Sequence, residues 1–251
     1  MNIFLNQIGS SRIFLKMESV RIYKCGKSIV SISSTEKYII RSEDAFYYPT
    51  KDVFESCFDV HEMKLERIVR DNILLPIGMI LIIMVSLAYY FNSAKYVIVD
   101  NNFVLSTVML LVNIPLHEIG HVLMLKKLYP ECKIKVGFKF VFIYPAVYVD
   151  TSFSYLLPKY KRIAVYMAGN TMNAIFVILI GIFFPFYNKY LYLIVDNILI
   201  NFIPIVKSDG YYSVMALFNK YTVEKSMKKN MVDSFLRGLI MFFVMLLLAY
   251  F

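Results

Sequence analysis

Three ionisable side chains lie together inside an otherwise apolar stretch of the sequence, LLVNIPLHEIGHVLML at residues 110–125. His117 and His121 are four residues apart, so on a helix they share one face and can each direct a nitrogen at one metal ion. Neutral imidazole suits Zn²⁺, and a catalytic zinc site has three protein ligands and one open position. Glu118 is placed to take a proton from water that the metal activates. The pattern therefore predicts a hydrolytic zinc site.

The apolar surroundings of this motif strengthen the prediction. A charged group at the centre of a membrane span costs about 2.5–3.5 kcal/mol on insertion scales, so ionisable residues there are functional by default. Two of the three histidines in the chain fall in this pentapeptide. A buried structural cluster would not require the four-residue spacing, and we interpret both histidines as metal ligands.

The third metal ligand must come from elsewhere in the chain. In NFIPIVKSDGYY, Pro204 and Gly210 would break a helix and leave the Asp209 carboxylate free to turn inward. An Asp-Gly pair beside a span is usually a simple turn, and taken alone this pair would be interpreted as one. Asp150 and Asp196 are other carboxylate candidates, but neither follows a helix-breaking signal tied to an asparagine. Asp209 is thus the best placed of the three carboxylates, and the residues alone leave the alternatives open.

Both motifs together, in this order, resemble the paired signatures of the site-2 proteases, which are intramembrane zinc metalloproteases. That family has HExxH in one span and Asn-x-x-Pro-x-x-x-x-Asp-Gly near the end of a later one, and NFIPIVKSDG has this spacing. The resemblance implies that His117, His121 and Asp209 bind one Zn²⁺ per chain. It also implies that Glu118 is the general base and that Asn201 lies near the substrate carbonyl, where it stabilises the oxyanion.

The segment after HEIGH resembles a narrower group. YPAVYVDTSFSYLLPKYKRIAVYMAGNTMNAIF is similar to the matching segment of the peptide zinc metalloproteases that occur beside bacterial gene clusters for ribosomally made, bacteriocin-type peptides. The resemblance covers about residues 105–215. It implies a zinc metalloendopeptidase of a bacterial cell membrane that acts on a membrane-associated peptide or protein.

The composition predicts an α-helical polytopic membrane protein. The chain is 59% hydrophobic and 18% charged, with a mean hydropathy of +0.59. About five segments are apolar enough to be spans: Ile73–Phe91, Phe103–Leu125, Ile163–Phe186, Tyr190–Val206 and Phe235–Phe251. The last two have 17 residues each, at the short end of what crosses a bilayer.

The net charge of +9 is distributed unevenly along the chain. Eleven Lys and Arg residues precede the first span and eight lie between Lys126 and Arg162, whereas the connection at 92–102 has only one. The positive-inside rule therefore places the N-terminus in the cytoplasm, together with the basic segment after the second span and residues 207–234. Basic cytoplasmic segments account for the charge, so we expect a lipid bilayer as partner and no nucleic acid.

The first 70 residues predict a separate module. Short runs such as RIYK, SIVSIS, KYIIR and AFYY indicate small antiparallel strands. Residues 51–72 have the apolar spacing of a helix. We predict a cytoplasmic β-rich module of unknown role over 1–70, followed by a transmembrane metalloprotease domain over 71–251 with its core at 103–215.

Near-alternation of apolar residues from Phe138 to Val149 predicts a membrane-associated β-hairpin. Its edge cannot face lipid unpaired, so it must be covered by protein or line a cavity. An exposed edge could bind an extended substrate by β-augmentation.

Three functions remain open from the sequence. The favoured one is an intramembrane protease that matures a signalling or antimicrobial peptide. The alternative is a membrane immunity or peptide-export component that keeps the protease fold without catalysis. A zinc transporter is disfavoured, because its ionisable residues would be spread along a path rather than clustered at one point.

Overall fold

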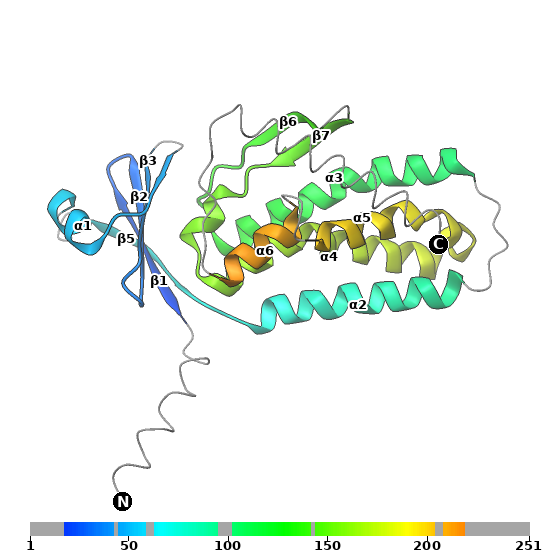
Figure 1. Ribbon diagram of the computed structural model, residues 1–251, viewed down its shortest axis with the longest axis horizontal. Helices are drawn as coiled ribbons and strands as arrows, with labels where there is room; N and C mark the ends of the chain where they lie inside the picture. Colours follow the sequence, from blue (N-terminus) through cyan, green and yellow to red (C-terminus); the bar gives the residue numbers. More distant parts are fainter. Residues whose placement is uncertain are drawn as a thin grey trace, which may run out of the picture. The chain divides into compact units, whose positions relative to one another are not determined.

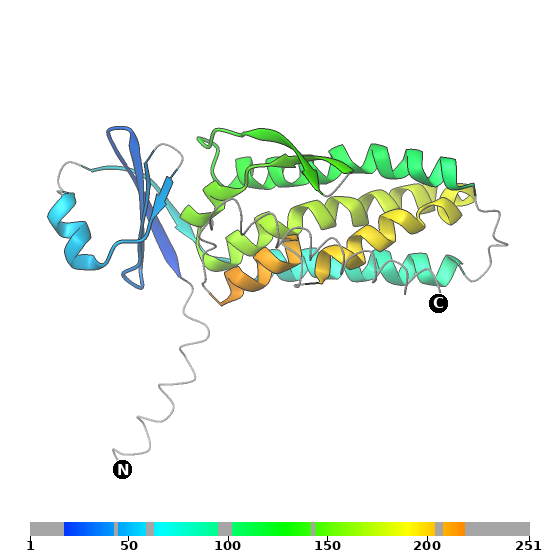
Figure 2. The ribbon, with the colours of Figure 1, turned by 45° about the horizontal axis from the view of Figure 1, so that its top comes forward.

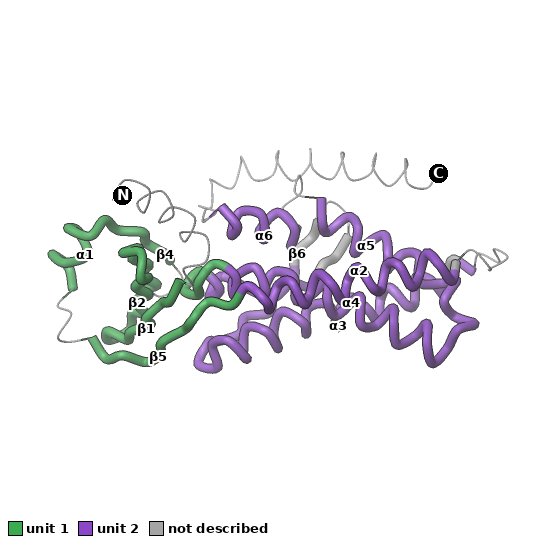
Figure 3. Tube along the Cα trace, turned by 90° about the horizontal axis from the view of Figure 1, so that it is seen from below, with its two compact units in different colours: residues 1–72, 155–159 green, residues 73–154, 160–251 purple. Residues whose placement is uncertain are grey.

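The structure of the protein is a computed structural model that describes residues 18–42, 45–58, 63–94, 102–141, 144–203 and 208–218. The chain divides into two compact units (Figure 3). Unit 1 holds the described residues up to Asn72 together with 155–159, and unit 2 holds the others. Each unit is described by itself below.

Unit 1 is a five-stranded antiparallel sheet with one short helix, α1 (Lys51–Cys57) (Figure 1). The strands have the order β4-β3-β2-β1-β5. Phe54 of α1 is 1% exposed and stacks on Tyr38 with ring centroids 4.5 Å apart. The strands are β1 (Ser19–Cys25), β2 (Ser28–Ser33), β3 (Tyr38–Ser42), β4 (Ala45–Tyr47) and β5 (Lys64–Arg70). The predicted strands at 21–48 therefore form.

The helix predicted over 51–72 is wrong for its second half. The helix ends at Cys57, and β5 pairs with β1 instead. This pairing satisfies backbone N–H and C=O groups that β1 would otherwise leave open on this side. Val69 is buried, whereas Ile68 is 55% exposed on the opposite face, which is the alternation of a strand. Tertiary pairing thus overrides the local helical spacing.

Three helices of unit 2 are long and apolar enough to cross a membrane: α2 (Leu74–Ala94), α3 (Phe103–Leu128) and α4 (Lys159–Phe183). They correspond to the first three predicted spans. In α4, 67% of the most apolar window is buried, against 28% in α2 and 22% in α3. Figure 2 accordingly shows α4 between the other two helices. The central helix α4 therefore provides the surface on which α3 positions its side chains.

The fourth predicted span, Tyr190–Val206, contains the shorter helix α5 (Tyr192–Phe202). Its 11 residues extend about 16 Å, roughly half of a hydrocarbon core. The helix ends here because Ile203 precedes a proline, which disfavours helical backbone, and Ile203 is extended. The described chain resumes with α6 (Asp209–Leu217). The fifth predicted span, Phe235–Phe251, lies outside the described residues.

The predicted hairpin is confirmed as a two-stranded antiparallel sheet of β6 (Val136–Val141) and β7 (Tyr144–Val149). It lies along α3, and β7 is the strand that contacts this helix (Figures 1 and 2). Two 3₁₀ helices complete the described chain, η3 (Ser152–Leu156) before α4 and η4 (Pro185–Tyr190) before α5.

Candidate metal centre

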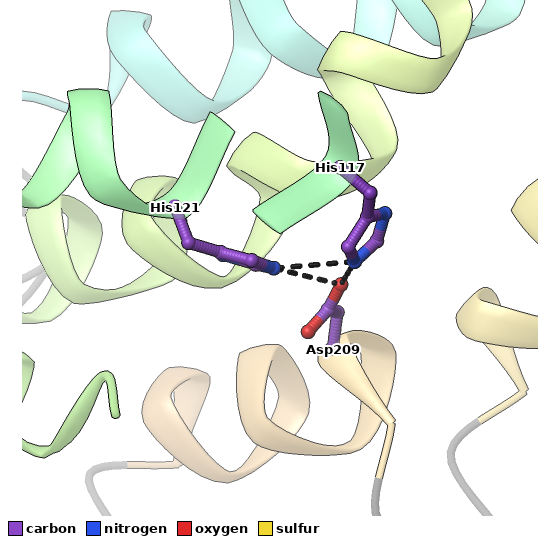
Figure 4. A group of neighbouring side chains, drawn as sticks. All are labelled: His117, His121 and Asp209. Atoms are coloured by element: carbon purple, nitrogen blue, oxygen red, sulfur yellow. Dashed lines mark hydrogen bonds and ion pairs between the residues drawn. The ribbon is translucent and has the colours of Figure 1, made fainter. Parts of the chain in front are cut away.

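Two histidines of α3 and the first residue of α6 meet in unit 2 (Figure 4). Asp209 Oδ2 lies 3.0 Å from His117 Nε2 and 3.4 Å from His121 Nε2, and the two nitrogens are 3.2 Å apart. The structure thus brings together the three residues predicted as metal ligands, although 88 positions separate the second histidine from the aspartate.

The triangle of ligand atoms fits a zinc ion. Zinc binds nitrogen and oxygen at about 2.0–2.2 Å in tetrahedral geometry, which sets the ligand atoms about 3.3–3.6 Å apart. The three observed edges, 3.0, 3.2 and 3.4 Å, lie within a few tenths of an ångström of this spacing. Two imidazoles and one carboxylate are also a donor set of catalytic zinc sites, which leave the fourth position open.

The tautomer of His121 follows from its second ring nitrogen. Nδ1 lies 2.8 Å from the carbonyl oxygen of Val165 in α4. A carbonyl can only accept, so Nδ1 carries a proton, and in its neutral form, which metal binding requires, the ring directs the Nε2 lone pair at the other ligands. With both rings neutral, the lone pairs and the carboxylate repel one another at this distance, and a bound cation would turn that repulsion into attraction.

The helices α3 and α4 run antiparallel with contacts at four-residue intervals around this site. Asn113 Nδ2 donates to Asn173 Oδ1 at 2.9 Å, one turn before His117, and His121 bonds to Val165 one turn after it. Both asparagines are fully buried. Two interhelical hydrogen bonds therefore fix the register of α3 on α4 on either side of His117.

Gly169 of α4 faces both histidine ligands. A Cβ at this position would lie 2.6 Å from His121 Nε2 and closer still to His117 Nε2. No side chain fits there, so the missing Cβ leaves the space in which the two nitrogens converge. The close approach of both nitrogens to Gly169 is the second observation that suits a bound ion.

Asp209 is positioned by the start of α6. The Ser208 side chain caps the helix by accepting from the Tyr211 N–H at 3.4 Å. Gly210 lies against the end of α5, where a Cβ would collide with the Asn201 carbonyl oxygen. Glycine is thus required after the aspartate for a close approach of two helices. Tyr212 packs on Tyr166 of α4, with ring centroids 5.5 Å apart, and holds α6 on the bundle.

The two residues predicted to act in catalysis occupy different places. Glu118 follows the first histidine on α3, and its Oε2 accepts from the Val149 N–H at 2.8 Å. The Asn201 side chain donates to Asn197 Oδ1 at 3.2 Å within α5, while its backbone packs against Gly210. Asn201 therefore lies next to the Asp209 element, and its predicted action on a substrate carbonyl stays a prediction.

The alternative carboxylates lie outside the group. Asp150 Oδ1 accepts from the Ser152 N–H at 2.9 Å, which is a local turn contact, and Asp196 belongs to α5. Among the described residues, neither joins the two histidines.

Replacing Gly169 by alanine should lower zinc affinity by about 100-fold, the upper end for changes around a metal's ligands. The new methyl group would displace both ligand nitrogens. Metal content after dialysis against graded chelator measures this change. Gly181→Ala is the matched control on the same helix, because its Cβ would meet the Tyr89 ring instead. Equal zinc loss in both variants would show that helix packing alone is responsible.

Four contributors to the site were not predicted from the sequence. The carbonyl of Val165 and the amide of Val149 are backbone groups, and no residue type announces them. Asn113 did carry a signal, since it is a polar residue inside an apolar span, four positions before His117. Gly169 appears in the sequence only as one small residue of an apolar segment, which is compatible with close helix packing and gives no sign of a metal site.

Comparison with curated proteins identifies a relative. The chain is 32% identical over 123 residues to the "Putative peptide zinc metalloprotease protein YydH" of Bacillus subtilis (strain 168), which covers 46% of this chain and 48% of that protein. The chain thus spans about half the length of this curated relative. No protein-family model matches the chain. No solved structure shows a significant match. The similarity to YydH supports a relationship to zinc metalloproteases, in agreement with the donor set of the metal centre.

Proposed function

We propose that the protein is a zinc metalloendopeptidase that hydrolyses a peptide bond of a membrane-associated peptide or protein inside the membrane, near its cytoplasmic face. The observation that carries this proposal is the triangle of His117 Nε2, His121 Nε2 and Asp209 Oδ2, with Glu118 beside the first ligand. The maturation of a signalling or antimicrobial peptide is the biological role that we propose for it.

The chemistry divides between the metal and the chain. When bound, zinc supplies a Lewis acid that acidifies water and polarises a peptide carbonyl. Glu118 accepts the proton of the attacking water and returns it to the leaving amide nitrogen, so that water is added across one C–N bond. The imidazoles and Asp209 hold the ion, and the Val165 carbonyl keeps His121 in the tautomer that binds it.

The depth of the site supports cleavage near the cytoplasmic face. His121 is seven residues before the end of α3, or about 10 Å along the axis, and Lys126 and Lys127 follow it in the last turn. Val165 is six residues after the start of α4, where Lys159 begins the helix. The positive-inside rule assigns these basic ends, and with them the N-terminus, to the cytoplasmic side of a multi-pass protein.

The hairpin supports an extended substrate. Val136 and Phe138 are 64% and 61% exposed, and Val147, opposite Phe138, is 40% exposed. Among the described residues, β7 pairs with β6 alone, so backbone groups on its other edge, such as the Val147 N–H, face away from β6 and are placed to bind a partner. Peptide bonds inside a helix are hidden by their own hydrogen bonds, and β-augmentation on this edge would hold a substrate in the extended form that hydrolysis needs.

Co-expression with candidate membrane-associated peptides tests the proposal. We expect mass spectrometry of the membrane fraction to find cleaved products with the wild-type protein. We expect only intact peptide with the variant in which His121 and Asp209 are both alanine. The same product pattern with both proteins would reject peptidase activity.

A further inference from the structure

The carboxylate of Glu118 is bound by a backbone amide from a distant part of unit 2. The N–H of Val149, the last residue of β7, donates to Glu118 Oε2 at 2.8 Å. The two residues are 31 positions apart in the sequence, and β7 packs on α3 in this region. The general base of the proposed reaction is thus tied to the hairpin.

The Val149 N–H can bind Glu118 because Val149 occupies a non-hydrogen-bonded position of the β6–β7 ladder. The Asp150 N–H donates to the Lys135 carbonyl at 2.8 Å, so these two residues form a hydrogen-bonded pair across the strands. Hydrogen-bonded and non-hydrogen-bonded pairs alternate in an antiparallel ladder, so the next pair, Val136 and Val149, does not exchange such bonds. The Val149 N–H therefore points away from β6, towards the open edge of β7.

Two other residues of β7 share this phase, Pro145 and Val147. Proline has no N–H and fits a strand where its nitrogen faces away from the neighbouring strand. Pro145 therefore has no N–H to donate. The Val147 N–H points to the open edge of β7, and the Val149 N–H donates to Glu118.

The geometry points to the Val149 N–H as a positioning donor for the base, an inference that rests on the proposed peptidase function. Hydrogen bonds to an ionised acceptor are roughly twice as strong as those between neutral groups. Binding of Oε2 restricts the torsions of the long Glu118 side chain and leaves Oε1 as the proton acceptor. The hairpin that offers its edge to a peptide therefore also orients the group that activates water.

The same contact sets where pairing with a peptide ends. A strand that docks on the open edge meets the Val147 backbone, whereas the Val149 amide is already engaged by Glu118. The Glu118 carboxylate thus occupies the place where a docked strand would put its next carbonyl oxygen. The peptide must leave the edge at this point, and the segment beyond the paired residue passes beside the base.

Amide exchange tests the contact without any substrate. In the zinc-loaded, full-length protein labelled with ¹⁵N-valine, we expect the Val149 amide to exchange most slowly in the wild type. Exchange in Glu118→Gln should be somewhat faster, because glutamine keeps an acceptor oxygen but not its charge. In Glu118→Leu the exchange should be about 10-fold faster, since the acceptor is gone. The Val147 amide is the internal control and should exchange alike in all three proteins. Unchanged exchange of Val149 in Glu118→Leu overturns the inference.

Proline variants then test the consequence for catalysis on the peptide that co-expression shows to be cleaved. Val149→Pro removes the donor without breaking a β6–β7 bond. We expect kcat to fall about 10–100-fold, the range for removal of an outer partner at a metal site, with KM and zinc content unchanged. Val147→Pro is the matched variant, since it removes an amide of the same phase that does not touch Glu118, and it should act on KM.

The outcomes separate this inference from the proposed function. An equal fall in kcat in both proline variants, or zinc loss in Val149→Pro, overturns the positioning role. If the wild type cleaves no peptide, the proposed function fails, and the valine exchange still decides whether Val149 holds Glu118. The exchange experiment also decides the question if Val149→Pro does not fold.

Discussion

Replacing both His121 and Asp209 by alanine should leave the purified protein without bound zinc. Removal of groups around the ligands already costs about 10–100-fold in affinity, and loss of two of three ligands must cost more. Metal analysis of protein purified in detergent gives the zinc-to-protein ratio. Thermal melting adds a second measure, because zinc at 100 times its Kd stabilises a binding protein by about 2.7 kcal/mol. Added zinc should raise the melting temperature of the wild type and not that of the double variant.

Asp196→Asn is the control for this experiment. It removes a carboxylate from α5, next to α6 in the sequence, that does not belong to the ligand group. We expect this variant to bind zinc like the wild type. A double variant that retains its full zinc content would contradict the metal centre and, with it, the proposed function.

Glu118→Gln should abolish hydrolysis and retain zinc. Glutamine preserves the size of the side chain and its acceptor for the Val149 N–H, but it cannot take up a proton from water. General base catalysis contributes about 10²–10⁴-fold, so the rate of peptide cleavage should fall by that factor or more. Product formation by mass spectrometry and the zinc ratio are measured on the same preparations.

Glu131→Gln serves as the control, since Glu131 is an exposed residue of the turn after α3. This variant should leave the rate of product formation and the zinc-to-protein ratio unchanged. A protein that acts in immunity or peptide export without catalysis would tolerate Glu118→Gln in a cellular assay of its function. Tolerance of that change would therefore favour the alternative over the protease.

The metal centre was predicted in two parts of different kinds. The spacing of His117 and His121 is a local property, because any helix places residues four apart on one face. The choice of Asp209 over Asp150 and Asp196 could only be favoured by the Asn-Pro-Asp-Gly pattern. The structure places the Asp209 carboxylate 3.0 Å from His117 because α6 crosses the end of α5 at Gly210.

The helices and strands also divide into those that local sequence determines and those that depend on distant segments. Long uncharged or weakly charged runs determine α2, α3 and α4, since a continuous apolar segment of this length forms a helix whatever its neighbours are. The strand β5 was missed because the residues of β1 with which it pairs lie 40–51 positions away in the sequence. The segment 155–159 also joins unit 1 through contacts that local spacing does not encode: Ser31 Oγ donates to the Leu156 carbonyl at 2.9 Å.

The sequence by itself determined the chemistry of this protein: which residue types could bind zinc, which one could move a proton, and which segments are apolar enough for a membrane. These are properties of composition and of spacing within one turn or one strand. Only the tertiary structure decided what surrounds those residues, namely the carbonyl of Val165, the close contact of both imidazoles with Gly169 and the amide of Val149. Backbone groups and the absence of a Cβ carry no side-chain signature, so their roles become visible only when distant segments pack together.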